Sequence, residues 1–480
     1  MKLKELCGSG MRILGDAQTD IDSVAYDSRK VCKGALFFCI SGYKTDGHVY
    51  AQAAVDNGAA ALMVTRPLDI NVPQVVVEDA RTAMAHLSRE FYGRPDEDLK
   101  MIGITGTKGK TTTTYMIKSV MEAAGKKMGL IGTIINMIGV KELHTDRTTP
   151  ESPDLFALLR QMADEGCDAV VMEVSSHSLV LGRVAGITFD VGVFTNMSRD
   201  HLDFHETFEN YMSAKKLLFY MTKRAAINTD DAASAFMMQG INTDWLTYGI
   251  KEKADVYAKN IEITPKGVSF DLCSTRSMIP INLNIPGIFS VYNALSAATA
   301  CMQLGLGLET IKTGLEAMPR VAGRFEVLDT GNRPFTIILD YAHTPDSLEN
   351  TLLTVKGFAR GRIITVFGCG GDRDRGKRPM MGEIAGRLST FTVITSDNPR
   401  TENPFDIIAQ IEAGIKKTDC AYVSIENRRA AIRYAIQNAS PDDIIVLAGK
   451  GHETYQEING VKHPFDEKIV VKELLDENLK

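Results

Sequence analysis

The sequence has no excess of basic residues and no long hydrophobic run. Its 480 residues include 54 Lys and Arg against 60 Asp and Glu, a net charge of −6. Without a basic excess a chain does not grip a phosphate backbone non-specifically, which argues against binding to nucleic acid. No apolar segment approaches the roughly 20 residues that cross a bilayer, and the N-terminal stretch lacks the apolar core of a signal peptide. We therefore expect a cytoplasmic protein that does not insert into a membrane.

Cysteine pairs are missing as well. The eight cysteines are scattered and none forms a Cys-x-x-Cys motif, so neither a disulfide framework nor a zinc site is predicted. Several lie in apolar runs such as FFCIS, and we expect reduced cysteines packed in the core. The sequence also lacks internal repeats and low-complexity segments. At about 150 residues per domain, a chain of this length predicts three domains.

The clearest motif is the stretch MIGITGTKGKTTTTYMIKSV at residues 101–120. A short apolar run, a turn containing Gly106 and the Gly-Lys-Thr of 109–111, and a segment of helical periodicity predict a strand, a turn and a helix. This arrangement offers backbone N–H groups, a lysine and a Mg²⁺-binding hydroxyl to phosphates. The usual template has glycine where this chain has Ile104, so the match is not literal. The alternative is a glycine-rich turn before a surface helix.

The chain is predicted to be an α/β protein of three domains, residues 1–97, 98–330 and 331–480. In the first domain the pattern predicts strands over 24–31, 34–42, 59–66 and 73–80 and helices over 47–58 and 82–92. In the second, strands over 101–105, 168–174 and 189–196 alternate with helices over 110–124, 154–165 and 207–221, which predicts a central P-loop-type parallel sheet. Residues 245–285 are β-rich, and helices are expected over 291–304 and 309–318.

The third domain is predicted to hold a Rossmann-like doubly wound sheet. Strands over 335–340, 362–368, 391–397 and 442–449 are each followed by a helical segment, and ligand-binding groups are expected at their C-terminal ends. Three loops there mix cations, carboxylates and amides, which suits a zwitterionic amino acid. These loops carry Arg373, Arg375, Asp397, Asn398, Arg400, Gly449, Lys450, His452 and Glu453. The alternative is solvent-facing charge.

Polar residues also follow strands of the central domain. Glu173 ends an apolar strand, where carboxylates beside a phosphate-binding turn hold Mg²⁺; the alternative is a satisfied carboxylate in a serine-rich turn. The loop NMSRDHLDFH at 196–205 contains His201 and fits either a metal site or an ordinary polar loop. From the residues alone, Lys215 reads as a solvated helix lysine, and the polar residues of 27–48 as solvated loops.

Taken together, these motifs resemble the Mur ligase family. GTKGKTT, TTPES, EVSSHSL, NMSRDHLDFH, AKKLLF, GRFE, DYAHTPDSLE, GCGGDRDRGKRP, SDNPRTENP and GKGHE occur in the family's order between Asp27 and His463. The resemblance implies a cytoplasmic, ATP-dependent ligase of peptidoglycan precursor synthesis. Such an enzyme extends UDP-N-acetylmuramoyl-L-alanyl-D-glutamate by an amide bond, through an acyl phosphate. In the family the DNPR loop goes with meso-diaminopimelate as the added amino acid; L-lysine is the alternative. We expect a monomer.

The resemblance also implies roles for single residues. ATP contacts are expected at Gly106, Thr107, Lys108, Gly109, Lys110, Thr111, Thr112, Asn293, Arg324 and Asp340. Contacts to the UDP-muramoyl dipeptide are expected at Tyr26, Ser28, Tyr43, Lys44, Thr45, Thr148, Thr149, Ser175 and Arg183. Contacts to the amino acid are expected at Arg373, Asp397, Asn398, Pro399, Arg400, Gly449 and Glu453. Mg²⁺ ligands are expected at Thr111, Glu173, His201 and a carbamylated Lys215, and catalytic roles at Lys110, Glu173, His201 and Lys215.

Two of these assignments have a physical rationale. A lysine near Mg²⁺ and short of water loses its proton readily, takes up CO₂ and becomes an anionic ligand, which suits Lys215. Arg400 would pair with the second carboxylate of diaminopimelate. Lysine has no such carboxylate, and leaving a buried arginine unpaired would cost roughly 3–5 kcal/mol. Ser290, Arg147 and Leu181 depart from common family choices, which weakens individual contacts.

Two rival functions remain open. A P-loop ATPase that couples hydrolysis to conformational work would use the same glycine turn. A nucleotide-sugar sensor without catalysis fits the first domain but leaves the loops of the third unexplained.

Overall fold

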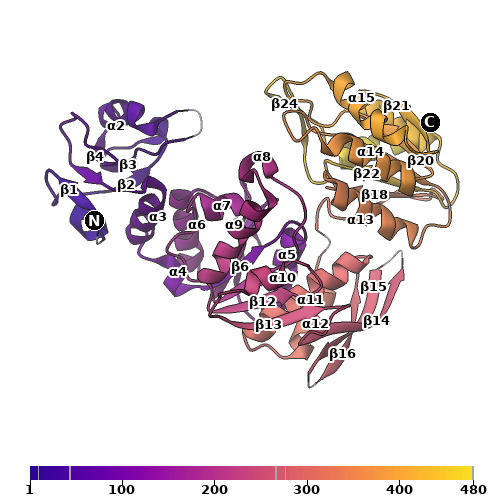
Figure 1. Ribbon diagram of the computed structural model, residues 1–480, viewed down its shortest axis with the longest axis horizontal. Helices are drawn as coiled ribbons and strands as arrows, with labels where there is room; N and C mark the ends of the chain where they lie inside the picture. The colour runs from indigo at the N-terminus through magenta and orange to yellow at the C-terminus, as the bar shows by residue number, and fades with distance from the viewer. Residues whose placement is uncertain (9, 43–44, 265–266, 276, 320, 478–480) are drawn as a thin grey trace.

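The computed structural model describes residues 1–8, 10–42, 45–264, 267–275, 277–319 and 321–477. Figure 1 shows an α/β chain whose amino-terminal and carboxy-terminal parts lie on either side of a central part. The predicted α/β class with largely parallel sheets is confirmed. The domain bounds 1–97, 98–330 and 331–480 stay a prediction.

The amino-terminal part is a small sheet in the order β1-β5-β4-β3-β2, in which β1 is antiparallel to β5 and the other pairs are parallel. Successive side chains of a strand point to opposite faces. Leu36 and Phe38 therefore pack with α1 and α3, whereas Phe37 and Cys39 pack with α2. Its elements are α1 (Leu3–Leu6), β1 (Arg12–Leu14), β2 (Ser23–Ala25), η1 (Ser28–Lys30), β3 (Ala35–Phe38), η2 (Gly47–Tyr50), α2 (Ala51–Asp56), β4 (Ala59–Val64), β5 (Gln74–Val76), α3 (Ala80–Phe91) and α4 (Pro95–Asp98).

The central part is built on a sheet in the order β16-β15-β14-β13-β12-β11-β6-β10-β7-β8-β9. Strands β14, β13, β12, β11, β6, β10 and β7 run parallel, and antiparallel pairing adds β15 and β16 at one end of the sheet and β8 and β9 at the other. Helices α5, α11 and α12 cover one face, and α6, α7 and α9 cover the other. Strand β6 lies in the middle, so the glycine turn that follows it opens at the centre of the sheet edge.

The strands and first helices of the central part are β6 (Lys100–Thr105), α5 (Lys110–Ala123), β7 (Met128–Ile131), β8 (Asn136–Ile138), β9 (Lys141–Leu143), α6 (Ser152–Asp164), β10 (Ala169–Glu173), α7 (Ser176–Val180), β11 (Val191–Phe194), α8 (Leu202–His205) and α9 (Phe208–Tyr220). They are followed by β12 (Arg224–Asn228), α10 (Ser234–Met238), β13 (Asp244–Gly249), β14 (Val256–Thr264), β15 (Gly267–Ser274), β16 (Met278–Leu283), α11 (Ile288–Gln303) and α12 (Leu308–Ala317).

The carboxy-terminal part is a doubly wound sheet in the order β17-β18-β22-β19-β20-β21, parallel except for β17. Helices α13, α14 and α15 pack on one face and α16 and α17 on the other. Its elements are β17 (Glu326–Leu328), β18 (Thr336–Asp340), α13 (Pro345–Lys356), β19 (Ile363–Phe367), α14 (Lys377–Leu388), β20 (Phe391–Ile394), α15 (Pro404–Ile415), β21 (Ala421–Ser424), α16 (Arg428–Gln437), β22 (Ile444–Ala448), β23 (Tyr455–Ile458), β24 (Val461–Pro464) and α17 (Glu467–Glu477).

Three expectations need correction. The strand predicted over 24–31 ends at Ala25, because the Asp27 carboxylate accepts the Arg29 N–H at 3.0 Å and caps the short helix η1. The helix predicted over 47–58 begins as the 3₁₀ turn η2. All eight cysteines are free, as predicted, but Cys32 is exposed and not in the core.

Candidate functional site

The glycine turn between β6 and α5 adopts a shape that only glycine allows. Gly106 has a φ of 145° and Gly109 a φ of 85°, in the region that L side chains rarely adopt. A Cβ on Gly106 would collide with the Thr195 hydroxyl, and one on Gly109 with the Asn293 side-chain oxygen. The backbone of the turn is therefore held against β11 and α11, which places Asn293 directly beside it.

Asn196, at the end of β11, fixes the turn from the other side. Its backbone carbonyl accepts the Thr107 N–H at 2.8 Å, and its side-chain oxygen accepts the Lys108 N–H at 2.9 Å. The Asn196 amide and the Thr195 hydroxyl both donate to the Lys108 carbonyl, at 3.0 and 2.7 Å. These neutral hydrogen bonds set the shape of the turn without using any of its charges.

Three lysines converge on the turn, and two of them donate hydrogen bonds to its backbone carbonyls. Lys110 Nζ donates to the carbonyls of Gly106 and Thr107 at 2.9 and 3.0 Å, and Lys215 Nζ donates to that of Gly106 at 2.8 Å. Burial lowers the pKa of Lys110, and burial together with the Lys110 charge holds the pKa of Lys215 well below its usual range. Burial also lowers the pKa of Lys108 to about 8, although Asp200 lies 3.4 Å away.

Glu173 is buried at the end of β10, opposite the turn. Its carboxylate accepts the Thr111 hydroxyl at 2.9 Å and the Thr133 N–H and hydroxyl at 2.9 and 3.0 Å. Its hydrogen-bond donors are thus neutral groups, although it is only 1% exposed. A buried carboxylate held by neutral donors beside a threonine hydroxyl presents the oxygen ligands that a hard cation such as Mg²⁺ prefers.

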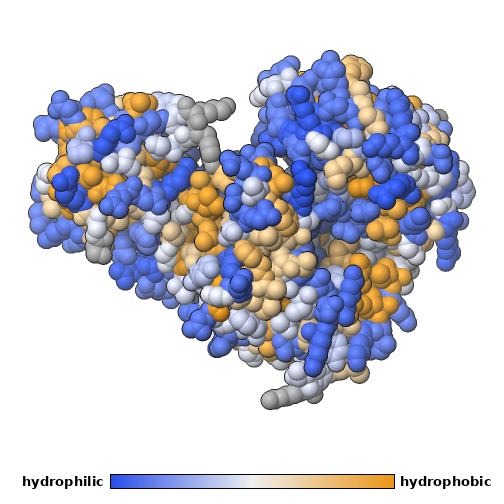
Figure 2. All heavy atoms as spheres, viewed as in Figure 1, coloured by the Kyte–Doolittle hydropathy of each residue, from blue (hydrophilic) through white to orange (hydrophobic). Residues whose placement is uncertain are grey.

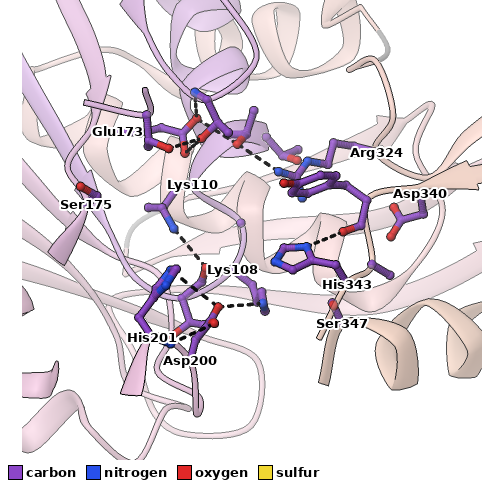
Figure 3. A pocket seen from close by; sticks show the side chains of 18 residues that line it. Lys108, Lys110, Glu173, Ser175, Asp200, His201, Arg324, Asp340, His343 and Ser347 are labelled. Carbon is purple, nitrogen blue, oxygen red and sulfur yellow. Dashed lines mark hydrogen bonds and ion pairs between the residues drawn. The ribbon is translucent and has the colours of Figure 1, made fainter. Parts of the chain in front are cut away.

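His201 lies on the far side of the same pocket, next to Asp200 (Figure 3). Burial lowers the pKa of His201 to about 4, so its imidazole is neutral near pH 7, the form that ligates metals. Within the described residues, no group of three or more His, Cys, Asp and Glu side chains is placed to hold a metal ion. A cation here would therefore depend on a hydroxyl, a lysine derivative or substrate oxygens as well.

The pocket over the glycine turn has a volume of about 210 Å³ and lies between the central and carboxy-terminal parts. Figure 3 shows Lys110 and Glu173 on one side and Arg324, Asp340 and His343 facing them. Arg324 Nη2 donates to the Thr111 hydroxyl at 3.4 Å, and its guanidinium lies 4.9 Å from the centre of the Tyr341 ring. Arg324 therefore links the two parts across the pocket.

A second pocket, of about 570 Å³, adjoins the first. The two share Asp200, His201, Tyr341 and His343 in their linings. In the space-filling view the surface is hollowed between the central and carboxy-terminal parts (Figure 2). Among the residues predicted to contact the amino acid, those lining this pocket are Arg373, Asp397, Asn398, Arg400, Gly449 and Glu453. The strand ends of β19, β20 and β22 thus meet as predicted, and a group bound in one pocket lies next to the other.

Arg400 reaches the second pocket from a strained turn with a φ of 50°. Its Nη1 donates to the Gly371 carbonyl at 2.8 Å, and its Nε lies 3.3 Å from Glu457 Oε2. Arg400 is therefore already paired, and the expected penalty of 3–5 kcal/mol for leaving it unpaired does not apply. Discrimination between diaminopimelate and lysine must therefore come from the contact between Arg400 and the ligand.

Three other residues expected at this pocket lie elsewhere. Arg375 points to Glu402, 3.3 Å away, and the Lys450 side chain is wholly buried beneath the pocket floor. The His452 ring packs 5.0 Å from that of Tyr341. Pro399 is not among the described residues that line the pocket. The predicted loops do line this pocket, but periodicity could not tell which of their side chains face inward.

The residues expected to contact the muramoyl dipeptide gather beside the first pocket. Thr148 and Ser175 line it, and the Thr149 hydroxyl donates to the Glu173 carbonyl at 2.9 Å. Arg183 Nη1 donates to the Thr149 carbonyl at 3.0 Å, and its Nη2 lies 2.8 Å from Glu151. This group therefore adjoins the glycine turn.

The residues expected at the uridine end lie in the amino-terminal part, away from both pockets. The Tyr26 hydroxyl donates to Asp154 of α6 at 2.6 Å, which ties that part to the central one. Ser28 opens η1, and the Thr45 carbonyl accepts the Gly42 N–H at 2.9 Å. Tyr43 and Lys44 lie outside the described residues.

Sequence reasoning missed several pocket residues. Tyr341 and His343 line both pockets, and Thr133 and Lys377 each line one. The Lys377 ammonium donates to the His343 carbonyl at 2.9 Å, and burial lowers the pKa of His343 to about 3. The signal was present for Tyr341 and His343, since DYAHTP directly follows a predicted parallel strand, where ligand groups are expected.

No helix in the described part of the chain is both long enough and apolar enough to span a membrane.

The sequence of this chain matches protein-family models and the sequences of known enzymes. Family models match in three segments: the Mur ligase family, catalytic domain at residues 20–92, the Mur ligase middle domain at 104–301, and the Mur ligase, glutamate ligase domain at 323–451. The UDP-N-acetylmuramoyl-L-alanyl-D-glutamate--2,6-diaminopimelate ligase 1 of Clostridium acetobutylicum is 50% identical, over 99% of this chain and 100% of its own length. The ligase of the same name from Caldanaerobacter subterraneus subsp. tengcongensis is 51% identical over the full length of both chains.

Solved structures agree with these matches. A structure of UDP-N-acetylmuramoyl-L-alanyl-D-glutamate--2,6-diaminopimelate ligase aligns with a TM-score of 0.72 and 33% identity, and the match covers 100% of this chain and 99% of that one. The MurF ligase from Thermotoga maritima, solved in complex with ADP, aligns with a TM-score of 0.67 and 17% identity over 97% of this chain and 99% of that one. The latter likeness concerns the fold alone.

Proposed function

The chain belongs to the Mur ligase family, and from this premise we propose that it joins meso-2,6-diaminopimelate to UDP-N-acetylmuramoyl-L-alanyl-D-glutamate. It is a ligase, and the new amide forms at the side-chain carboxylate of the D-glutamyl residue while ATP is converted to ADP and phosphate. One observation supports this proposal above the others. A cationic pocket on a glycine turn adjoins a pocket that mixes arginines with carboxylates.

The first step transfers the γ-phosphoryl group of ATP to the D-glutamyl carboxylate. A carboxylate oxygen attacks the γ-phosphorus of ATP. The bond between this phosphorus and the oxygen that joins it to the β-phosphate breaks, so ADP departs and an acyl phosphate remains on the dipeptide. Repulsion between the two anions is the main obstacle. Lys110, whose hydrogen bonds go to neutral carbonyls, offers this step a positive charge that no ion pair within the described residues ties to a carboxylate. The nucleotide would contact the turn from Gly106 to Thr112, with Asn293, Arg324 and Asp340 around it.

The second step forms the amide. The free amine of the amino acid attacks the acyl carbon, phosphate leaves with the former carboxylate oxygen, and the amine loses its proton. Holding both reactants in adjoining pockets makes this step effectively intramolecular, which can correspond to effective molarities of about 10⁵ M or more. Closure of the carboxy-terminal part over the central part would also keep water from the acyl phosphate.

Mg²⁺ would be held by Thr111, Glu173, His201 and a carbamylated Lys215. The hydroxyl and carboxylate oxygens around Glu173 suit a hard cation. The lowered pKa of Lys215 favours the neutral amine that takes up CO₂. The bound ion would screen the charge between the triphosphate and the acceptor carboxylate.

The two remaining substrates would be held by the groups described above. Thr148, Thr149, Ser175 and Arg183 would contact the muramoyl dipeptide, and Tyr26, Ser28 and the segment from Tyr43 to Thr45 the uridine end. Arg400 and Arg373 would take carboxylates of diaminopimelate, and Asp397, Asn398, Gly449 and Glu453 would complete that pocket. Pro399 would act only by shaping the loop. We further propose that the enzyme acts as a monomer in the cytoplasm, where ATP and reducing conditions suit its eight free cysteines.

An ADP-release assay with each substrate omitted in turn tests the proposal. The ligase predicts turnover only when the muramoyl dipeptide and the amino acid are both present. ADP release with neither the muramoyl dipeptide nor the amino acid present would favour a P-loop ATPase that performs conformational work. Binding of the UDP-sugar without any turnover would favour a sensor.

The choice of amino acid needs its own comparison. Product formation with meso-diaminopimelate is compared with that from L-lysine under the same conditions. We expect a clear preference for diaminopimelate. A preference for lysine would refute the assignment of Arg400 to the second carboxylate.

A further inference from the structure

A row of alternating charges lies beneath the second pocket. It runs through Glu467, Arg428, Asp397, Lys450 and Glu453, here called the charge row. Arg428 Nε lies 2.8 Å from Glu467 Oε1, and Arg428 Nη1 lies 4.0 Å from Asp397 Oδ2. Lys450 Nζ lies 4.0 Å from Asp397 Oδ1 and 3.2 Å from Glu453 Oε2. Carboxylates stand at both ends and in the middle, with a cation in each gap.

Three members of the row have no access to solvent. The side chains of Glu467, Arg428 and Lys450 are 0% exposed, whereas those of Asp397 and Glu453 are 10% and 16% exposed. Only Asp397 and Glu453 line the pocket. Burying charges is costly unless each is paired. This row contains three carboxylates and two cations, so one negative charge remains without a partner inside it.

Further contacts hold the two cations in place. Arg428 Nη2 donates to the Ala448 carbonyl at 2.8 Å, and Lys450 Nζ donates to the Asn398 side-chain oxygen at 3.1 Å. The Asn398 amide in turn donates to Glu453 Oε2 at 2.8 Å. Since Arg428 is held by the end of β22 and Lys450 by the loop after β20, the two cations fix the carboxylates that face the pocket.

The excess negative charge is shared between the carboxylates that face the ligand. Burial alone would raise the pKa of Asp397, but the Lys450 and Arg428 charges outweigh burial and lower it. Burial and the nearby Asp397 charge raise the pKa of Glu453. A cation bound beside Glu453 would relieve this repulsion.

We propose that Glu467, Arg428 and Lys450 are positioning residues for the second ammonium group of the incoming diamino acid, which supplies the cation that the charge row lacks. This inference rests on the proposed function. The amine that attacks the acyl phosphate must be uncharged, so the other amine is the one that stays cationic. Glu467 touches no ligand in this account and acts through Arg428 and Asp397.

The Glu467→Gln variant removes the charge of this side chain and keeps its shape. Its amide oxygen keeps the acceptor for Arg428 Nε, while the negative charge at the end of the row is lost. We expect the KM for meso-diaminopimelate to rise about fivefold to tenfold, because a buried charge acts at reduced dielectric screening. The KM for ATP and kcat should stay within about twofold.

Glu473→Gln is the matched control. Glu473 lies on the same helix, α17, with its side chain 51% exposed and paired to Arg429. We expect no change in the KM for diaminopimelate. If Glu467 only ties α17 to α16, Glu467→Gln will behave like this control, and the proposal is wrong.

An amino acid that lacks the second amine provides the decisive comparison. 2-Aminopimelate keeps the reacting amine and both carboxylates, so its KM, or its Ki against diaminopimelate, should be the same in the wild type and in Glu467→Gln. An equal shift for both amino acids would overturn the proposal, because the effect would then not depend on the ammonium group. Absence of wild-type turnover with diaminopimelate would overturn the proposed function, and this inference with it.

Discussion

The two adjoining pockets use their cations in opposite ways. Around the glycine turn, the Lys110 ammonium donates to the carbonyls of Gly106 and Thr107, and within the described residues no ion pair joins it to a carboxylate. In the second pocket, Arg428 and Lys450 alternate with carboxylates, and Arg400 has Glu457 beside it. The first arrangement suits a polyanion, and the second suits a zwitterion that brings both signs of charge. Pairing, rather than the number of charged residues, distinguishes the two sites.

The largest expected effect comes from removing the Lys110 charge, which forms no ion pair within the described residues. Lys110→Met should lower kcat about 10³-fold, as does the loss of a group that stabilises charge only in the transition state. The measurement is ADP release with all three substrates at saturation. The KM for diaminopimelate should change less than threefold, because the lysine serves only the first pocket.

Lys126→Met is the control for that substitution. Lys126 lies just after α5 and is half exposed, paired with Asp168. It should leave kcat unchanged. A Lys110→Met enzyme with near wild-type kcat would contradict the view that this charge acts on the phosphates.

A smaller effect is expected where the charge is already paired. Arg400→Met should raise the KM for meso-diaminopimelate about 10-fold to 100-fold, the range for losing a charged hydrogen bond. Use of L-lysine should change much less, since lysine has no second carboxylate. Arg375→Met, in a neighbouring loop and 70% exposed, is the matched control. An equal rise in KM for both amino acids would show that Arg400 supports the loop and does not bind the second carboxylate of the ligand.

The smallest effect concerns stability and its dependence on pH. Arg378 is 0% exposed and makes two hydrogen bonds to Glu402, of 2.9 and 3.0 Å, behind the loops of the second pocket. This contact lowers the pKa of Glu402 from 4.5 to about 2. A carboxylate whose pKa is lowered by folding stabilises the fold at pH values above its ordinary pKa. This contribution is lost as the pH falls toward 2.

Glu402→Gln should therefore lower the free energy of unfolding at pH 7 and differ less from the wild type at pH 3. Urea unfolding at the two pH values measures this difference. Glu383→Gln, an exposed partner of Lys417, should show no such dependence. A Glu402→Gln deficit that stays constant between pH 7 and pH 3 would mean that the ion pair does not hold the loops.

The same contrast explains how much the sequence could predict. The glycine turn is contiguous, so strand, glycines, lysine and helix could be identified within 20 residues, and β6 and α5 lie within one residue of their predicted starts. The ends of β19, β20 and β22 could also be located from periodicity. Since ligand groups gather at the ends of parallel strands, the second pocket was predicted in outline.

Contacts between distant segments could not be predicted. Arg428 and Glu467 are 39 positions apart, and neither stands in a motif. The Arg400–Glu457 pair depends on how the β23–β24 hairpin lies against the DNPR loop, which no periodicity describes. The strand expected over 24–31 was placed correctly but ends early, because the Asp27 carboxylate accepts the Arg29 N–H and so favours a 3₁₀ turn over a continued strand.

We propose that the D-glutamyl carboxylate is phosphorylated in the first pocket and is then attacked by an amine held in the second. Labelling the D-glutamyl side-chain carboxylate with oxygen-18 tests it directly. We predict that each turnover transfers one labelled oxygen to the released phosphate and leaves the other in the amide. Phosphate released without the label would contradict the account.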